Sequence, residues 1–428
     1  MTAARWTKTD SWTFWSFAVG LLLENFTFSL AAITTGWVQV PKALTSLLLA
    51  WAPLWLIIGI AVAGPVSDRL GRKGTFYLTM SLYALGSIGL IFSSSYLPLL
   101  FFLALSLFAA GGEMNTIMAA SHEMMPAKHR GRATMLELNF INLGGLILAI
   151  AALSSAYQKV LVQREIVGVT ALLALAVLFL LRSRTPESLP FLLRRGRSEQ
   201  ARREAERYYG DQAQLRLQAG QVGERRAGTP APRSSLALRL FTTMTTSFAG
   251  AAGFGLLTYV VGPYYFKNLT APILLVATGV GFLSGFFGLI ADRVSRKLLL
   301  LIGYLGSAVF TLWIWLALPA WAHDLTYFWI LLILLNIFVN VGYLTEDTLK
   351  GEVWPTERRG SYTALVRFVS IGLYIVTIYL TANLSIGQYL IFNLGVWVIG
   401  LLGALAWFFF GHETGLGVGL AEASGELP

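Results

Sequence analysis

Residues 64–73 read GPVSDRLGRK and residues 288–297 read GLIADRVSRK, so an acid followed by clustered bases occurs twice in the same register. A second pair recurs in the same way, with EMMPAKHRG at 123–131 and EVWPTERRG at 352–360. Glycine lets helices approach closely at a turn, and acids and bases at helix ends can form ion pairs that break and reform. One such loop could be a simple basic anchor, but four matched loops indicate two similar halves.

Long apolar runs separate these loops. Hydrophobic residues make up 56% of the 428 residues and charged residues 13%, against about 25% charged in soluble proteins. A bilayer is crossed by about 20 consecutive apolar residues, and the chain has roughly twelve such runs. The predicted spans are 13–35, 43–67, 76–94, 97–123, 133–156, 166–181, 236–265, 272–290, 298–318, 327–348, 362–382 and 389–410. Both loop pairs therefore recur after six spans, which predicts a parallel duplication about an axis along the membrane normal.

We accordingly expect an all-α membrane protein with 12 transmembrane helices in two six-helix bundles. The bundles are predicted at 1–181 and 236–411, with a cytoplasmic linker that carries short surface helices at 182–235 and a cytoplasmic tail at 412–428. Most lysines and arginines lie in alternate loops and in the linker, and the positive-inside rule then places both termini in the cytoplasm. The net charge of +10 thus reflects membrane orientation rather than nucleic-acid binding. We expect a monomer in a bacterial inner (plasma) membrane.

The motif at 64–73 resembles the loop-two motif of the major facilitator superfamily, and its copy at 288–297 lies where that family has one. The motifs at 123–131 and 352–360, and the Pro-Glu-Ser at 186–188, resemble the sugar-porter and metabolite–proton symporter branch. This resemblance implies the major facilitator fold, with a solute site between the bundles near the bilayer midplane. It also implies small cytoplasmic helices that latch the inner gate. The seventh span lacks the pattern with which sugar porters bind hexoses, which argues against a hexose as the solute.

Three carboxylates fall in the interior of the predicted spans of the first half, away from the span ends. Insertion of a charged residue at membrane depth costs roughly 2.5–3.5 kcal/mol, so intramembrane charges are functional candidates by default. Glu24 and Glu113 lie near the middle of spans one and four, and we expect one or both to carry a coupling proton. Glu137 lies closer to the cytoplasm, where it is predicted to belong to the inner gate. The alternative for each is a hydrogen-bonded structural group.

The second half offers a polar face and a fixed positive charge. Asn336, Asn340 and Tyr343 stand at i, i+4 and i+7 and so share one face of span ten. Arg367 lies about two turns into span eleven, where it could bind a solute carboxylate or pair with an acid of the gate. The candidate solute-binding residues are Asn25, Asn142, Thr246, Tyr259, Asn336, Asn340, Tyr343 and Arg367. The predicted cytoplasmic gate comprises Gly64, Asp68, Arg69, Gly71, Arg72, Glu123, Arg130, Glu137, Asp292, Arg293, Arg296, Glu346, Asp347, Glu352 and Arg359.

These features favour a secondary transporter of a small polar organic solute, coupled to protons and working by alternating access. A facilitative uniporter of a sugar, an organic acid or an organic cation is the nearest alternative, and a transporter-like receptor is a more distant one. The chain has no cysteine and only 4 histidines. It also has no metal-ligand cluster and no phosphate-binding glycine loop, so we expect no enzyme activity, no cofactor and no metal.

Overall fold

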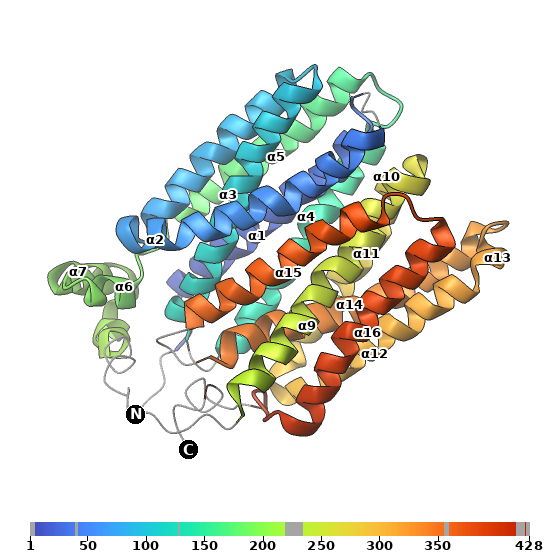
Figure 1. The fold of residues 1–428 in the computed structure, drawn as a ribbon. Helices are drawn as coiled ribbons and strands as arrows, with labels where there is room; N and C mark the ends of the chain where they lie inside the picture. The colour runs from blue at the N-terminus through green and yellow to red at the C-terminus, as the bar shows by residue number, and fades with distance from the viewer. Residues whose placement is uncertain are drawn as a thin grey trace.

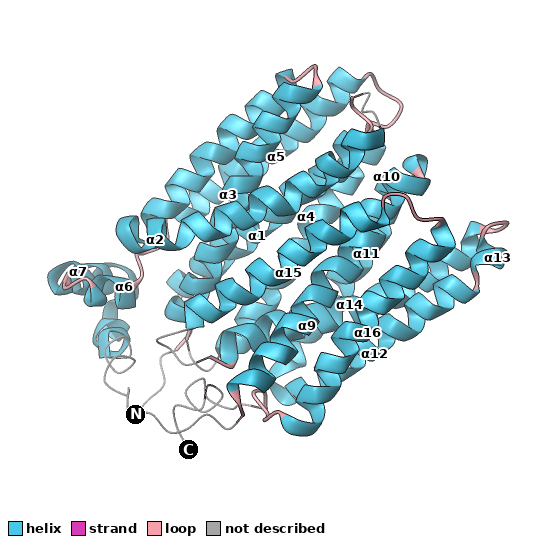
Figure 2. Cartoon of the chain, viewed as in Figure 1, coloured by secondary structure: helices cyan, strands magenta, loops and turns pink. Residues whose placement is uncertain are grey.

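The computed structural model describes residues 5–38, 42–126, 129–218, 234–354, 359–416 and 424, and within these ranges helices are joined by turns and short loops, with no strand (Figures 1 and 2). Twelve helices within the described residues are long and apolar enough to cross a membrane. They are Lys8–Thr34, Leu44–Ser67, Arg69–Phe92, Tyr96–Met124, Gly131–Ser154, Val160–Arg182, Leu236–Tyr265, Lys267–Ala291, Arg296–Leu316, Leu325–Glu352, Ser361–Thr381 and Ile386–Phe410. The prediction of twelve spans in two six-helix bundles is confirmed.

The N-terminal half contains α1 (Lys8–Thr34), α2 (Lys42–Phe92), α3 (Tyr96–Met124), α4 (Arg130–Ser154) and α5 (Val160–Arg182). The C-terminal half contains α9 (Leu236–Gly255), the π-helix η3 (Leu256–Val260), α10 (Val261–Tyr265), α11 (Thr270–Ser284), η5 (Gly285–Arg293), α12 (Arg296–Leu316), α14 (Leu325–Glu352), α15 (Arg359–Thr381) and α16 (Ile386–Phe410). In Figure 1 the halves lie side by side, one coloured from blue to green and the other from yellow-green to red. The seam between them is formed by α4 against α11 and by α2 against α15.

Several helices begin earlier than the sequence predicts. Helix α1 starts at Lys8 rather than residue 13, because Thr7 and Asp10 form a reciprocal capping box that continues the helix into polar residues. Spans two and three form one helical element, α2, and the turn between them is concentrated at Gly71, where φ is +85°, rather than spread over a loop that ends before residue 76. Only glycine adopts this conformation without strain. The basic loop is therefore a sharp corner between two nearly continuous helices.

Two short helices, α6 (Leu189–Arg194) and α7 (Ser198–Tyr209), follow α5. They lie beside the end of the N-terminal half (Figure 1). The Nη2 of Arg216 donates to Asp10 at 2.6 Å, and the hydroxyl of Thr9 donates to the carbonyl of Tyr208 at 2.6 Å. The segment is thereby tied to the start of α1. We call this side of the protein, with Arg72, Arg296 and α6–α7, the basic side.

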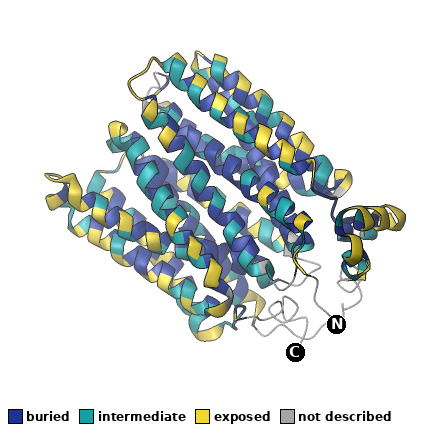
Figure 3. Ribbon diagram, turned by 180° about the vertical axis from the view of Figure 1, so that it is seen from behind, coloured by how far each residue is buried: buried dark blue, intermediate teal, exposed yellow. Residues whose placement is uncertain are grey.

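Large apolar side chains on the outer surface mark the part that faces lipid. Leu85, Leu173 and Phe409 are 57%, 64% and 68% exposed, and Figure 3 shows exposed residues recurring along the outward faces of the helices while buried residues line the inside. In water so many exposed apolar side chains would be an aggregation hazard, whereas hydrocarbon solvates them. The structure is thus an integral membrane protein.

Candidate functional site

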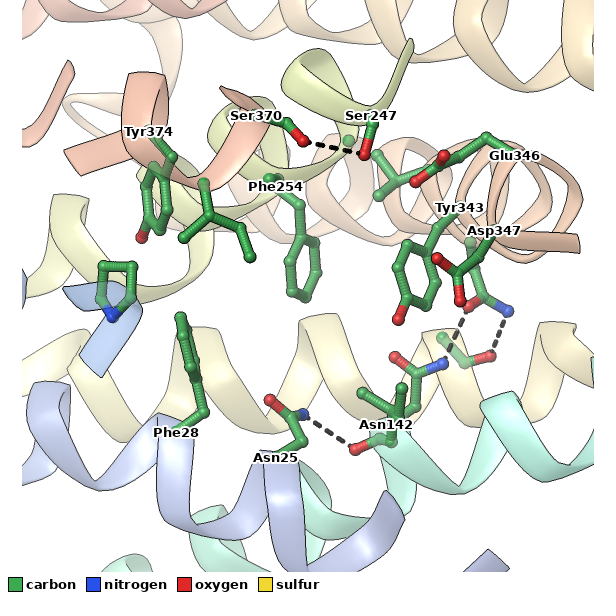
Figure 4. Close-up of a pocket in the computed structure, with 18 of the residues that line it drawn as sticks. Asn25, Phe28, Asn142, Ser247, Phe254, Tyr343, Glu346, Asp347, Ser370 and Tyr374 are labelled. Carbon is green, nitrogen blue, oxygen red and sulfur yellow. Dashed lines mark hydrogen bonds between the residues drawn. The ribbon is translucent and has the colours of Figure 1, made fainter. Parts of the chain in front are cut away.

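A cavity of about 150 Å³ lies between the two halves, which is of the size of a small organic solute. Its walls come from α1 to α4 on one side and from α9, η3, α11, α14 and α15 on the other. Figure 4 shows side chains from both halves pointing into the same space. The predicted solute-binding residues that line it are Asn25, Asn142, Tyr259, Asn336, Asn340, Tyr343 and Arg367.

Side-chain amides connect the two halves across this cavity. The Nδ2 of Asn142 on α4 donates to the Oδ1 of Asn340 on α14 at 2.8 Å. The hydroxyl of Tyr259 on η3 donates to the Oδ1 of Asn25 on α1 at 2.9 Å, and the Nδ2 of Asn25 donates to the carbonyl of Ile141 at 2.8 Å. Hydroxyl or carbonyl groups of a solute can replace such bonds, because they offer the same donors and acceptors.

The C-terminal half places four charged side chains in the cavity wall. The Nζ of Lys350 lies 2.7 Å from Oδ1 of Asp347 and 3.1 Å from Oε1 of Glu346, and it donates to Ser247 at 3.0 Å. The Nη2 of Arg367 donates to both oxygens of Asp347, at 3.1 and 3.2 Å. The sequence predicted Glu346 and Asp347 at the gate, but the structure places both in the cavity wall. One turn of α14 separates Glu346 from Lys350, so their side chains share a face.

Glu24 lines the cavity from α1 and is 5% exposed. Its Oε2 has no hydrogen-bond partner among the described residues. The charged groups that act on it from the opposite half are Arg367 and Asp347. A buried carboxylate without a dedicated cation is poorly stabilised in its charged form, so Glu24 has the setting of a proton-binding group.

Glu113, the other predicted coupling residue, does not line the cavity. It is fully buried within the N-terminal half and forms a two-pronged ion pair with Arg182 at the end of α5. Thr79 donates to its Oε2 at 2.5 Å, and the guanidinium carbon of Arg182 lies 3.5 Å from the centre of the Phe76 ring. Arg182 belongs to the sixth span rather than to the linker and its role was not predicted. Of the two predicted coupling residues, only Glu24 therefore lies at the solute space, because the carboxylate of Glu113 is taken up by Arg182 and Thr79.

Thr246 also lies outside the cavity lining. The hydroxyl of Thr246 donates to the carbonyl of Thr242 at 2.7 Å, and the hydroxyl of Tyr304 donates to the carbonyl of Thr246 at 2.7 Å. The next residue, Ser247, does line the cavity, because one residue turns a helix face by about 100°. Ser247 accepts from Ser370 at 3.1 Å (Figure 4), and neither serine was predicted.

On the basic side, predicted gate residues of the first half meet around the Gly71 corner. The Nη2 of Arg72 lies 2.8 Å from Oε1 of Glu123. The carboxylate of Glu187 accepts from the backbone N–H groups of Arg72 and Lys73, at 3.0 and 3.1 Å. Burial raises the pKa of Glu187 above its usual value despite these bonds. The Pro-Glu-Ser segment thus docks on the loop-two motif.

The second half repeats this arrangement. The Nη2 of Arg296 lies 3.7 Å from Oε1 of Glu352. The Oε1 of Glu413 accepts from the backbone N–H groups of Arg296, Thr414 and Gly415, at 2.8, 3.0 and 2.7 Å, and its Oε2 accepts from the Ser295 hydroxyl. Burial acts to raise the pKa of Glu413, but these donors outweigh it and hold the pKa below the usual value.

Other predicted gate residues lie apart from these clusters or outside the described side chains. Glu137 is buried and accepts from Ser121 at 2.6 Å, between α4 and α3. Arg69 and Arg293 are exposed, and Gly64 has open space around it. The side chains of Asp68, Arg130, Asp292 and Arg359 fall outside the described residues.

Contacts between the halves occur on both sides of the cavity. Towards the basic side, the Nδ2 of Asn139 donates to the carbonyl of Phe282 at 2.9 Å, and the ring of His122 packs against Gly351. Towards the opposite side, Ser46 and Tyr264 share a hydrogen bond of 2.8 Å. The halves thus touch on both sides of the cavity.

Comparison with known proteins identifies the family. The sequence signature described as sugar (and other) transporter matches residues 17–422. The niacin transporter NiaP of Acinetobacter baylyi is 26% identical over 196 residues, which span 46% of this chain and 43% of that protein. The glucose transporter GlcP of Staphylococcus epidermidis is 23% identical over 76% of this chain and 75% of that protein.

Solved structures show the same fold. The proton:xylose symporter XylE bound to 6-bromo-6-deoxy-D-glucose superposes with a TM-score of 0.73 at 20% identity, over 96% of this chain and 98% of that one. The inward open XylE from E. coli gives a TM-score of 0.73 at 18% identity, with the same coverage. Because the signature extends over nearly all of the described spans, the chain belongs to the sugar (and other) transporter family and is a twelve-span membrane transporter of the major facilitator fold.

Proposed function

We propose that this protein is a proton-coupled secondary transporter of a small polar organic solute, and that it works by alternating access. The observation that carries the proposal is Glu24, a carboxylate in the wall of the central cavity whose Oε2 has no partner among the described residues. Such a group can take up a proton when the cavity is open to one side and release it when the cavity opens to the other.

The mechanism follows from contacts that are distributed between the halves. Asn142–Asn340 and Tyr259–Asn25 cross the seam at the cavity, and hydrogen bonds with a solute would replace them. The two halves would then rock about the solute, breaking the Asn139–Phe282 contact on one side or the Ser46–Tyr264 contact on the other. The ion pairs Arg72–Glu123 and Arg296–Glu352 each lie within one half and would fix the helix ends of that half, while Asn139–Phe282, which crosses the seam, would hold the basic side closed in the outward-open state.

The solute class and the location are part of the same proposal. The names of the relatives and structural neighbours refer to niacin, glucose and xylose, all small polar organic molecules. The amide-rich and aromatic cavity suits a solute of that size. The positive-inside rule places the basic side, with both termini, in the cytoplasm, and the bacterial relatives favour the inner membrane.

A thermal-shift screen of purified protein against a metabolite library identifies the solute, since a ligand that binds only the folded state raises its apparent stability. The identified solute is then added to proteoliposomes that contain a pH-sensitive dye. Solute-dependent proton movement that is lost in Glu24→Gln supports the proposal. Transport without proton movement would establish the uniporter instead, and binding without any transport would favour a receptor.

A further inference from the structure

We propose that the solute is a small aromatic monocarboxylate, that its carboxylate is bound by Arg367, and that one proton on Glu24 accompanies it. This inference rests on the proton-coupled transport proposed above and names its substrate class. Three features of the cavity carry it: the guanidinium of Arg367, the charge balance of the lining and the aromatic walls.

Arg367 has donors that the protein itself does not use. It is 3% exposed and lines the cavity. Its Nη2 donates to Asp347, but its Nε and Nη1 have no hydrogen-bond partner among the described residues. An unsatisfied buried donor on a charged group is costly, and a carboxylate is the acceptor that satisfies a guanidinium best. Lys350 is a weaker candidate for binding the carboxylate, because its Nζ already contacts Glu346, Asp347 and Ser247.

The charges of the lining explain why a proton should travel with the anion. The acids of the lining are Glu24, Glu346 and Asp347, against the bases Lys350 and Arg367, so with every group ionised the lining carries one net negative charge. An anion alone would add a second negative charge in a site shielded from water, which is unfavourable. If Glu24 binds a proton at the same time, the loaded cavity carries the same charge as the empty one. Proton and carboxylate then move together without net charge.

Other ionisable groups leave this balance unchanged. The Glu113–Arg182 pair on α3 and α5 is internally compensated. Besides Arg367 and Asp347, the ionisable groups that act on Glu24 are the phenols of Tyr83 on α2, Tyr259 on η3 and Tyr343 on α14. Glu137 on α4 is buried but is not part of the lining. Glu24 is therefore the acid of the lining for which we find no cation within hydrogen-bond reach.

The walls opposite the charged cluster are aromatic. The rings of Phe28 and Tyr259 lie 5.2 Å apart at 65°, and those of Phe254 and Tyr259 lie 5.6 Å apart at 89°. Figure 4 shows Phe28 and Phe254 reaching into the cavity from opposite halves, with Tyr374 beside them. Edge-to-face pairs leave ring faces available for stacking, which a planar solute ring can use. A planar aromatic solute that carries a carboxylate therefore matches this cavity, because its ring can stack on the aromatic side chains while its carboxylate reaches the guanidinium of Arg367.

Matched probes that differ in charge test the proposal. The ligand pairs are benzoate with benzamide and nicotinate with nicotinamide, with D-xylose as a neutral sugar, and binding is measured on purified full-length protein in nanodiscs. We expect the carboxylates to bind and their amides to bind at least about tenfold more weakly. Arg367→Lys should weaken carboxylate binding by about tenfold to a hundredfold while the pairing with Asp347 is retained. Arg202→Lys, on the exposed surface of α7, is the matched control and should bind as the wild type does.

Proton dependence provides a second readout that a structural role of Arg367 would not reproduce. Carboxylate affinity should fall by up to about tenfold per pH unit over the range in which Glu24 loses its proton, and Glu24→Gln should bind carboxylates with no such dependence. Uptake into proteoliposomes should respond to a pH gradient but not to membrane potential.

Each alternative result has a defined meaning. Binding of D-xylose alone, or of neither carboxylate, overturns the carboxylate assignment. Proton-coupled, potential-driven uptake of a neutral solute would also overturn it and leave the proposed symport intact. Carboxylate uptake without proton movement refutes the symport. If Arg367→Lys weakens the binding of neutral and anionic ligands equally, Arg367 maintains the shape of the cavity wall and does not bind the carboxylate, which also overturns the proposal.

Discussion

Glu113→Gln is the substitution for which the structure changes the expectation most. The carboxylate is fully buried, its two oxygens accept from both terminal nitrogens of Arg182, and Thr79 donates to one of them. Arg182 is 1% exposed, so glutamine leaves a buried positive charge without its counter-charge. Removing one partner of a buried ion pair costs about 3–5 kcal/mol. We expect Glu113→Gln to lose about that much of the free energy of unfolding and to retain the pH profile of transport in the protein that remains folded.

The assay is reversible unfolding in mixed micelles with increasing SDS, followed by helical circular dichroism. The double variant Glu113→Gln/Arg182→Met removes the stranded charge and should recover a large part of the loss. Glu206→Gln breaks the exposed Arg202–Glu206 pair, at 2.9 Å, and serves as the control with no measurable change. If Glu113→Gln is as stable as the wild type and its transport no longer depends on pH, Glu113 is the coupling carboxylate and our reasoning is refuted.

Three further predictions concern the basic side. Gly71→Ala should destabilise the docked linker by about 1–2 kcal/mol, because φ is +85° and a Cβ would lie 2.5 Å from Oε2 of Glu187; limited proteolysis of the linker that is no faster than in the wild type would contradict this. Glu413→Gln should lower stability near neutral pH, and the difference should vanish as the pH falls: a pKa held below its usual value stabilises the fold above pH 4.5, the value for an ordinary glutamate, and that stabilisation is lost as the carboxyl protonates. Thermal unfolding at a series of pH values tests this, and a difference that persists in acid would count against it. Asp68→Asn should impair turnover and leave solute binding largely intact, as the loop-two motif predicts; uptake at the wild-type rate would remove Asp68 from the gate.

The fold was predictable because its determinants are local and repeated. Apolar runs of membrane-crossing length define the spans, and the duplicated loops at 64–73 and 288–297 give the two halves and their parallel relation. Helix ends were less accurate. Capping by Thr7 and the corner at Gly71 extend helices into residues whose composition alone resembles a loop.

The cavity was partly predictable, because a polar face on an apolar helix is unfavourable against lipid and therefore faces a cavity or another helix. Asn336, Asn340 and Tyr343 share such a face, and all three line the cavity. The partners of charged residues were harder to predict. Lys350 and Arg182 lie at span ends, where a basic residue usually anchors a helix at the lipid surface, but the rotation of their helices turns them inward towards Asp347 and Glu113. Which face a terminal charge occupies depends on tertiary packing, which the sequence pattern does not specify.

The central claim is that solute crosses the membrane only when the two halves separate alternately on each side of the cavity. The chain has no cysteine, so a single introduced pair of cysteines can be oxidised and reduced without side reactions of other thiols. Asn139 and Gly285 face each other across the seam on the basic side, where a Cβ on Gly285 would contact the amide of Asn139 directly. In Asn139→Cys/Gly285→Cys, oxidation to a disulfide should stop solute uptake into proteoliposomes, and reduction should restore it. Uptake that continues with the disulfide fully formed would contradict the account.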